Sequence, residues 1–139
     1  MTDLEKFWES VKKEEIAFLA TSAGGNVTMR TVSPVYFEDA ILLFTRADAQ
    51  KYTHLKENPN CCISVGRVFM EAKAEFLGHT MLDENKALRD IYEEKFAGAF
   101  DEGIDYGGRD SEFILLKPTR IRGWGYEDGV PTGAFDYKF

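Results

Sequence analysis

The sequence predicts an α+β domain in which about six antiparallel strands form a β-barrel core flanked by helices. Three apolar segments follow one another with only turns between them: residues 16–21, 27–37 and 40–45. Strands joined without intervening helices pair antiparallel, so these segments predict a meandering sheet. Helical periodicity occurs in three short stretches, which begin near residues 3, 49 and 83.

The first helix and the first hairpin have clear local signals. Thr2 and Glu5 are spaced as a capping box, and apolar side chains then recur at helical spacing up to Val11. The glycine-rich turn at residues 22–26 is expected to join the first two strands as a hairpin.

The middle of the chain predicts a short helix between strands. We expect Asp48 to cap a helix over residues 49–57 that Asn58 and Pro59 end. The rest of the chain predicts two strands (residues 61–67 and 71–80), a second full helix (83–96) and a long loop (97–109). A last strand (111–126) and an aromatic tail (127–139) follow. The tail is expected to dock on another surface.

Length and composition restrict the possible classes of protein. A chain of 139 residues and 15.8 kDa predicts one domain, residues 1–139. A net charge of −7 argues against nucleic acid or an anionic membrane as a partner. The apolar runs are too short to span a bilayer, and the first ten residues do not resemble a secretory signal, so we expect a cytoplasmic protein. The adjacent Cys61 and Cys62 are expected to be reduced.

Common catalytic and metal-binding patterns are missing from the sequence. His54 and His79 are the only histidines, and no nucleophile-elbow motif accompanies them. Neighbouring residues on a strand point to opposite faces, so Cys61 and Cys62 cannot converge on a metal, and we expect no metal site. The glycine-rich turns lack the lysine and hydroxyl of a phosphate-binding loop.

A small group of cationic and hydroxyl residues remains. Arg30 lies on a strand, Thr45 ends another, and Lys51 falls in the first turn of the helix that follows, with Arg46 nearby. Together with the helix dipole, such residues could converge on one phosphate. The alternative is that each is a solvated surface charge.

Three motifs of the sequence resemble those of a known protein family. R-T-V-S at 30–33, I-L-L-F-T at 41–45 and Q-K-x-x-x-L-x-x-N-P at 50–59 resemble the pyridoxamine 5′-phosphate oxidase-like family of FMN-binding split β-barrels. The resemblance covers roughly residues 16–126. It implies a six-stranded antiparallel split barrel, and a homodimer with FMN in a groove between the subunits.

The resemblance also implies roles for individual residues. Arg30 and Lys51 would hold the FMN phosphate, with Gln50 as a weaker ligand. The strand Thr31, Val32 and Ser33 would lie beside the isoalloxazine ring and the ribityl chain, and Phe44 and Thr45 would add contacts. Glu71 stands where the classical oxidases use a glutamine near the flavin. Trp124 resembles a tryptophan that reaches the partner's flavin, and plain packing at the dimer interface is the alternative.

The chain departs from the classical oxidases at its end. They close with an arginine and histidine pair that grips pyridoxine phosphate, whereas no arginine or histidine follows Arg122 here. The resemblance is therefore to the short general stress, nitroimidazole resistance and flavin reductase-like members. It implies an FMN-dependent oxidoreductase with a small electron donor or acceptor, possible donors being NADH and NADPH. A non-catalytic flavin-binding stress module is the alternative, and deazaflavin or haem could replace FMN. Tyr36, Tyr106 and His79 are candidates for an acid or base.

Overall fold

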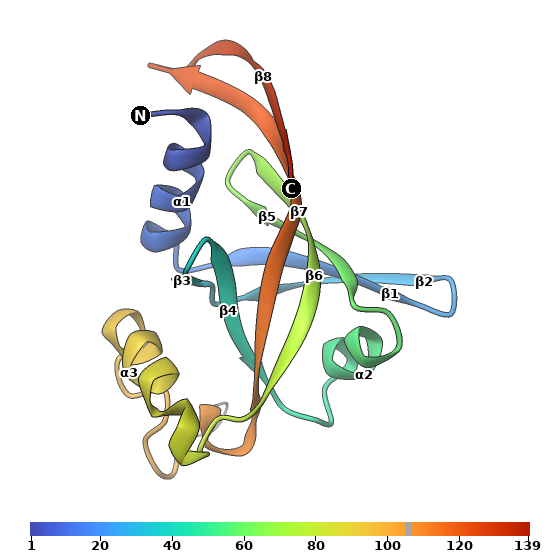
Figure 1. Cartoon of the computed structure of the whole chain (residues 1–139), viewed down its shortest axis with the longest axis vertical. Helices are drawn as coiled ribbons and strands as arrows, with labels where there is room; N and C mark the ends of the chain where they lie inside the picture. The colour runs from blue at the N-terminus through green and yellow to red at the C-terminus, as the bar shows by residue number, and fades with distance from the viewer. Residues whose placement is uncertain (105–106) are drawn as a thin grey trace.

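The structure is a computed structural model that describes residues 1–104 and 107–139 (Figure 1). Its α-helices are α1 (Asp3–Lys13), α2 (Gln50–Glu57) and α3 (Lys86–Lys95), and short 3₁₀ turns cover Asp83–Asn85 and Gly108–Asp110. Its strands are β1 (Ala17–Ala23), β2 (Asn26–Val32), β3 (Val35–Phe37), β4 (Ala40–Thr45), β5 (Asn60–Val65), β6 (Val68–His79), β7 (Glu112–Glu127) and β8 (Val130–Lys138).

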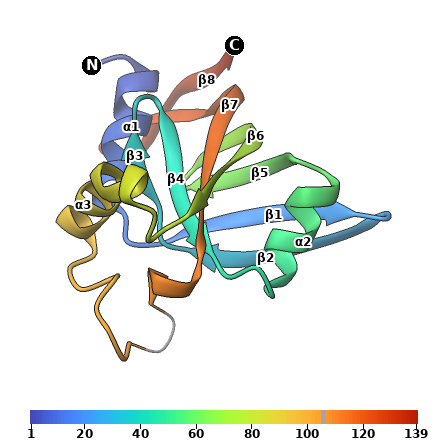
Figure 2. The same cartoon turned by 60° about the horizontal axis from the view of Figure 1, so that its bottom comes forward.

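The sheet is antiparallel throughout the described residues and curls into an incompletely closed barrel. Its strand order is β2-β1-β5-β6-β7-β4-β3, with β8 added on β7. The strands β2 and β3 are the two ends of this path, yet only Ser33 and Pro34 separate them along the chain. So short a link forces the two ends of the sheet to approach each other, which bends it (Figure 2). The predicted α+β class and antiparallel barrel are confirmed, with the barrel split between β2 and β3.

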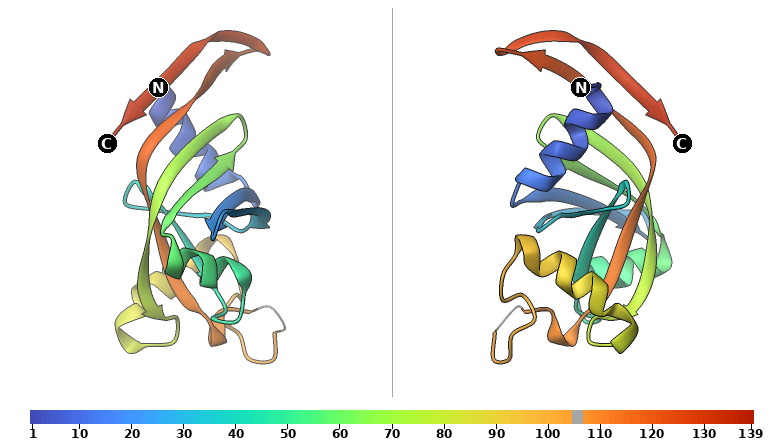
Figure 3. Two further views of the ribbon diagram at one scale, coloured as in Figure 1. Left: turned by 90° about the vertical axis from the view of Figure 1, so that its right-hand side faces the viewer. Right: turned by 60° about the vertical axis from the view of Figure 1, so that its left-hand side comes forward.

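The structure differs from the prediction in three details. The described residues form eight strands rather than six. The expected strand over residues 27–37 is divided, because Pro34 has no N–H for a ladder and follows a residue that it restricts. The tail, expected to dock on another surface, pairs with β7 as β8. Figure 3 shows β7 and β8 extending together beyond the rest of the sheet as an arm.

A tight turn sets the register of the first hairpin. Gly24 and Gly25 both have positive φ, +56° and +82°, as a two-residue type I′ turn requires. The turn pairs Thr21 with Thr28 and places Leu19 opposite Arg30. The inward-facing side chains of β1 and β2 therefore lie next to one another near α2.

Two apolar clusters form the core. The larger one fills the barrel and includes Phe7 and Val11 of α1, whose capping box is formed as predicted. The smaller one lies under α3 around Tyr92 and Phe113. No helix among the described residues is both long and apolar enough to cross a membrane.

One face of the sheet remains apolar and uncovered. Phe18, Met29, Phe69 and Trp124, which we call the outer sheet face, are 47%, 68%, 48% and 56% exposed. Their register explains why they share a side, since Phe18 pairs with Ser64 and Ser64 pairs with Phe69. Large apolar side chains exposed side by side on one face are typical of an interaction surface.

Candidate functional site

Arg30 lies in a socket made by two strands and a helix. Its Nη1 donates to Thr21 Oγ1 at 2.7 Å and to the Leu19 carbonyl at 3.3 Å. Its Nη2 donates to Thr28 Oγ1 at 2.5 Å and to Gln50 Oε1 at 3.3 Å. All four acceptors are neutral, so they orient the guanidinium without neutralising its charge.

Lys51 adds a second positive charge beside Arg30. It is half-buried, and both burial and the charge of Arg30 lower the pKa of its ammonium. Burial also lowers the pKa of Arg30. Within the described part of the chain, neither residue forms an ion pair with a carboxylate. Two uncompensated cations at close range in an acidic protein favour binding of an external anion.

The start of α2 strengthens this preference. The expected cap, Asp48, was wrong: Ala49 is the N-cap, and no side chain accepts a hydrogen bond from the first turn. Backbone N–H groups at a helix start have no partner within the helix, and they attract anions. Gln50, the first residue of α2, contacts Arg30 directly, so the helix start and the two cations face the same place.

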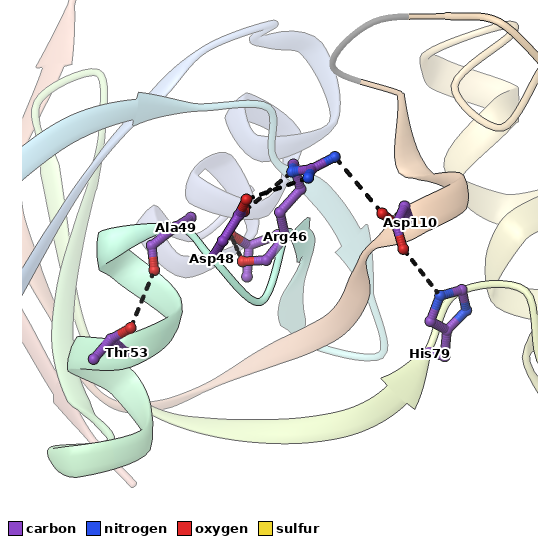
Figure 4. A network of polar contacts seen from close by, with 7 residues as sticks. Arg46, Asp48, Ala49, Thr53, His79 and Asp110 are labelled. Carbon is purple, nitrogen blue, oxygen red and sulfur yellow. Dashed lines mark hydrogen bonds and ion pairs between the residues drawn. The ribbon is translucent and has the colours of Figure 1, made fainter.

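Arg46 lies outside this cluster. Its guanidinium contacts Asp48 at 3.1 Å and 3.2 Å, and it lies 3.8 Å from Asp110, which in turn lies 3.9 Å from His79 (Figure 4). The hydrogen bond to Asp48 raises the pKa of Arg46, and the same contact lowers the pKa of Asp48. Arg46 was one of the four residues first considered as phosphate ligands, and carboxylates of the same chain neutralise its charge.

The sequence analysis did not identify three residues around Arg30. Thr28 could have been found, because it lies two positions before Arg30 and so shares its strand face. Thr21 requires the register of the hairpin, and His54, whose Nδ1 lies 3.1 Å from Thr21 Oγ1, requires the packing of α2 on β1. His54 is consequently part of the socket rather than a plain surface residue.

Thr21 provides the first test of this socket. For the FMN site that the sequence resemblance implies, we expect Thr21→Val to weaken binding by about 1 kcal/mol, or roughly fivefold, because Arg30 loses its 2.7 Å acceptor. Thr21→Ser keeps the hydroxyl and should bind almost as the wild type does. Titration of FMN fluorescence against each variant measures the effect, and equal affinities for the valine and serine variants would contradict a positioning role.

Four other predicted ligands lie in the part of the chain that runs from the end of β2 to the end of β4. The side chain of Val32 points into the barrel core, and Thr45 is buried, its hydroxyl donating to the Arg46 carbonyl at 3.4 Å. Ser33 and Phe44 meet at a separate cavity against α3, and the hydroxyl of Tyr92 donates to the Ser33 carbonyl at 2.8 Å.

The side chains of three predicted ligands do not face the Arg30 socket within the single chain. Thr31 is exposed beside Phe18, and Glu71 lies 3.8 Å from Arg120. Trp124 lies on the arm, beyond the turn that joins β5 to β6, whereas Thr21 of the socket pairs with Cys61 at the far end of β5. One chain therefore does not gather all ten predicted residues.

The candidate acids and bases have structural partners. Tyr36 donates to Asp39 at 2.8 Å, and this hydrogen bond raises the pKa of Tyr36. His79 accepts from the Met81 amide at 3.1 Å through Nδ1, and its Nε2 is the atom that faces Asp110. Tyr106 lies outside the described residues.

Comparisons with known proteins agree with this fold. The family model for pyridoxamine 5′-phosphate oxidase matches residues 4–125, most of the chain. The chain belongs to the pyridoxamine 5′-phosphate oxidase family. A search of curated proteins finds no match.

Several solved structures resemble the fold of this member of the pyridoxamine 5′-phosphate oxidase family. An FAD-binding protein from Mesorhizobium loti aligns with a TM-score of 0.67 at 16% identity, covering 87% of this chain and 92% of that one. General Stress Protein 26 from Bacillus anthracis aligns with a TM-score of 0.63 at 16% identity, with the same two coverages of 87% and 92%. A heme binding protein from Mycobacterium smegmatis aligns with a TM-score of 0.73 at 18% identity, covering 99% of this chain but 58% of that one. At these identities the likeness shows the fold alone.

Proposed function

We propose that residues 1–139 form a single domain that binds FMN as a homodimer and acts as a flavin-dependent oxidoreductase on a small substrate. We do not propose pyridoxamine phosphate as that substrate, because residues 123–139, which include β8, contain neither arginine nor histidine. One observation supports the proposal above all: Arg30 and Lys51 converge at the uncapped start of α2 without a carboxylate partner in the described chain.

The charge of FMN fits this cluster. A phosphomonoester carries between about −1.5 and −2 charges at neutral pH, which two cations and a helix start can offset. Arg30, Lys51 and Gln50 would hold the phosphate. The backbone from Thr31 through Val32 to Ser33, with Phe44 and Thr45, would lie beside the ribityl chain and the ring. The flavin supplies the electron and hydride chemistry, while these residues bind and orient it.

The distribution of the remaining ligands supports a dimer. Glu71 and Trp124 lie on the side of the sheet that carries the apolar outer sheet face, away from the Arg30 socket of their own chain. A second copy seated on that face would bury the exposed apolar side chains and could present its Glu71 and Trp124 to the first copy's flavin.

FMN is preferred over haem as the cofactor because of the paired cations. Both ring nitrogens of His79 face neighbouring groups, and His54 bonds to Thr21 through Nδ1, which leaves its Nε2 available. The histidines therefore do not decide between the two cofactors. Arg30 and Lys51 suit a phosphate group, which FMN carries and haem lacks.

We place the protein in the cytoplasm on the basis of its thiols. Cys61 and Cys62 are free, and burial raises the pKa of Cys61 to about 12. Free cysteines of this kind persist in a reducing compartment.

The test is a visible absorption spectrum of the purified protein, recorded before and after addition of FMN and removal of the excess by gel filtration. We expect flavin bands near one FMN per subunit, eluting at the size of a dimer. A protein that retains no flavin after saturation with FMN would overturn the proposal. Arg30 and Lys51 would then be solvated surface charges.

Turnover separates an enzyme from a flavin-binding module. An enzyme should oxidise NADH or NADPH when a quinone or nitro compound is supplied, and free FMN at the same concentration sets the background. Retention of flavin without turnover above that background would favour the non-catalytic stress module.

A further inference from the structure

A cavity of about 370 Å³ lies where the link between β2 and β3, the strand β4, the helix α3 and the segment after it meet. Its described lining includes Ser33 and three aromatic residues that we call the aromatic wall: Phe44, Tyr92 and Phe96. A volume of this order is typical of small-molecule sites.

The aromatic wall is held in place. The Phe44 and Tyr92 rings lie 4.9 Å apart, and the Tyr92 and Phe96 rings lie 5.4 Å apart. Phe100 supports Phe44 from behind at 5.6 Å, and Gly108 packs against both rings so closely that a Cβ there would overlap Phe100. The rings are tilted by 55° and 35° to one another, so they offer a fixed apolar surface on which an aromatic ring can pack edge to face.

The polar groups of this wall are mostly engaged. The Tyr92 hydroxyl is occupied by the Ser33 carbonyl, and burial raises the pKa of Tyr92, so the phenol stays neutral. Lys95 of the same helix turns away from the cavity and donates to the carbonyls of Val11 and Pro34 at 2.7 Å and 2.6 Å. The cavity is thus left without a hydrogen-bond donor from α3.

The charge on the described lining of the cavity is negative. Among the described lining residues, Asp101 is the only one with a charged side chain. A neighbouring cavity of about 400 Å³ shares Asp101 and contains Arg46 and Arg109. Both arginines face carboxylates: Arg46 faces Asp48, and Arg109 lies 3.7 Å from Glu102. Lys95, whose Nζ lies 5.3 Å from the centre of the Phe96 ring, is bound to two backbone carbonyls. An anionic ligand would therefore meet Asp101 while these neighbouring cations are engaged elsewhere.

The cavity is also well placed relative to the phosphate cluster. Ser33 follows Arg30 by three residues of extended chain, a span of roughly 10 Å. This span is comparable to a ribityl chain, so an FMN anchored at Arg30 would reach the entrance of the cavity with its ring.

We propose that this cavity receives the second reactant of the flavin, and that it selects small flat aromatic compounds that are uncharged or cationic. Asp101 disfavours anionic compounds. The inference rests on the proposed FMN site, and it goes further by naming the chemical class of the substrate and a residue that sets it.

The test compares two quinones of the same ring system, neutral menadione and its anionic sulfonate. Their dissociation constants are measured by equilibrium dialysis against the oxidised, FMN-saturated protein and, in parallel, against flavin-free protein. We expect menadione to bind about tenfold more tightly than the sulfonate, since a like charge nearby costs on the order of this factor at a partly exposed site.

Three variants test whether Asp101 and this cavity cause the preference for menadione. Asp101→Asn should reduce the menadione preference to about threefold or less, because the repulsive charge is gone. Glu102→Gln removes the adjacent carboxylate, which does not line the cavity, and should leave the preference unchanged. Ala97→Leu fills part of the cavity and should weaken menadione binding about tenfold while FMN retention stays as in the wild type.

Several outcomes would overturn the inference. Equal affinities for the two quinones would remove the role of Asp101, and unchanged menadione binding in Ala97→Leu would place the compound elsewhere. Loss of FMN from Ala97→Leu would show that the flavin ring itself fills the cavity. Failure of FMN retention in the wild type would reject the proposed function separately, because dialysis against flavin-free protein still reports whether the cavity discriminates.

Discussion

Replacing Arg30 or Lys51 by alanine is expected to weaken FMN binding by about 1.5 to 3 kcal/mol in each case, the usual worth of a hydrogen bond to a charged group. The physical reason is that each residue contributes a cation without a carboxylate partner in the described chain. Titration of FMN against each variant, followed by flavin fluorescence, measures the loss.

Arg46→Ala is the matched control for this prediction. Arg46 also precedes α2 closely and carries the same charge, but Asp48 and Asp110 already neutralise it. Its removal should change FMN affinity by less than about 0.5 kcal/mol, as expected for an exposed ion pair. Unchanged affinity in both Arg30→Ala and Lys51→Ala would contradict the phosphate assignment, and so would an equal loss in all three variants.

Phe18→Arg is expected to convert the proposed dimer into a monomer. Phe18 lies in the outer sheet face, where the opposing copy would bring apolar side chains against it. A charge buried there without a partner should cost at least about 2 kcal/mol of association free energy, the threshold of an interface hot spot. Light scattering behind gel filtration measures the mass over a range of concentrations.

The same variant should also lose FMN, because in the proposed dimer a second copy's Glu71 and Trp124 would no longer complete the proposed FMN site. Leu82→Arg is the control, since Leu82 is exposed to a similar extent, 41% against 47% for Phe18, but lies between β6 and α3. Thermal unfolding should show that both variants remain folded. A Phe18→Arg protein that stays dimeric and keeps its flavin would place the interface on another surface.

Local signals in the sequence were sufficient for most individual elements. The capping box at Thr2 and the Gly24-Gly25 turn formed as predicted, because each depends only on residues a few positions apart. The prediction was wrong at Asp48, where a carboxylate next to a helix start had two possible partners. Arg46 bound it instead, and a sequence does not show which of two nearby donors a carboxylate will choose.

The number of strands required long-range information. The tail is rich in aromatic and polar residues and includes Pro131, a pattern that does not identify a strand by itself. It became β8 because β7 extends far enough past the barrel to offer it a free edge. The division of β2 from β3 could have been predicted from the sequence, since Pro34 falls within residues 27–37 and a proline has no N–H to donate to a ladder.

The sequence by itself determined the residue types of a phosphate site and the local frame that carries them: Arg30 on a strand and Lys51 in the first turn of a helix. Family membership also followed from its motifs. Only the tertiary structure decided which cations remain without a carboxylate partner, since this depends on segments far apart in the chain. Asp110 approaches Arg46 from β7's side of the barrel, while Thr21, Thr28 and Gln50 surround Arg30 with neutral acceptors. Charge compensation acts through space, so the curled sheet, rather than the order of residues, selects the anion site.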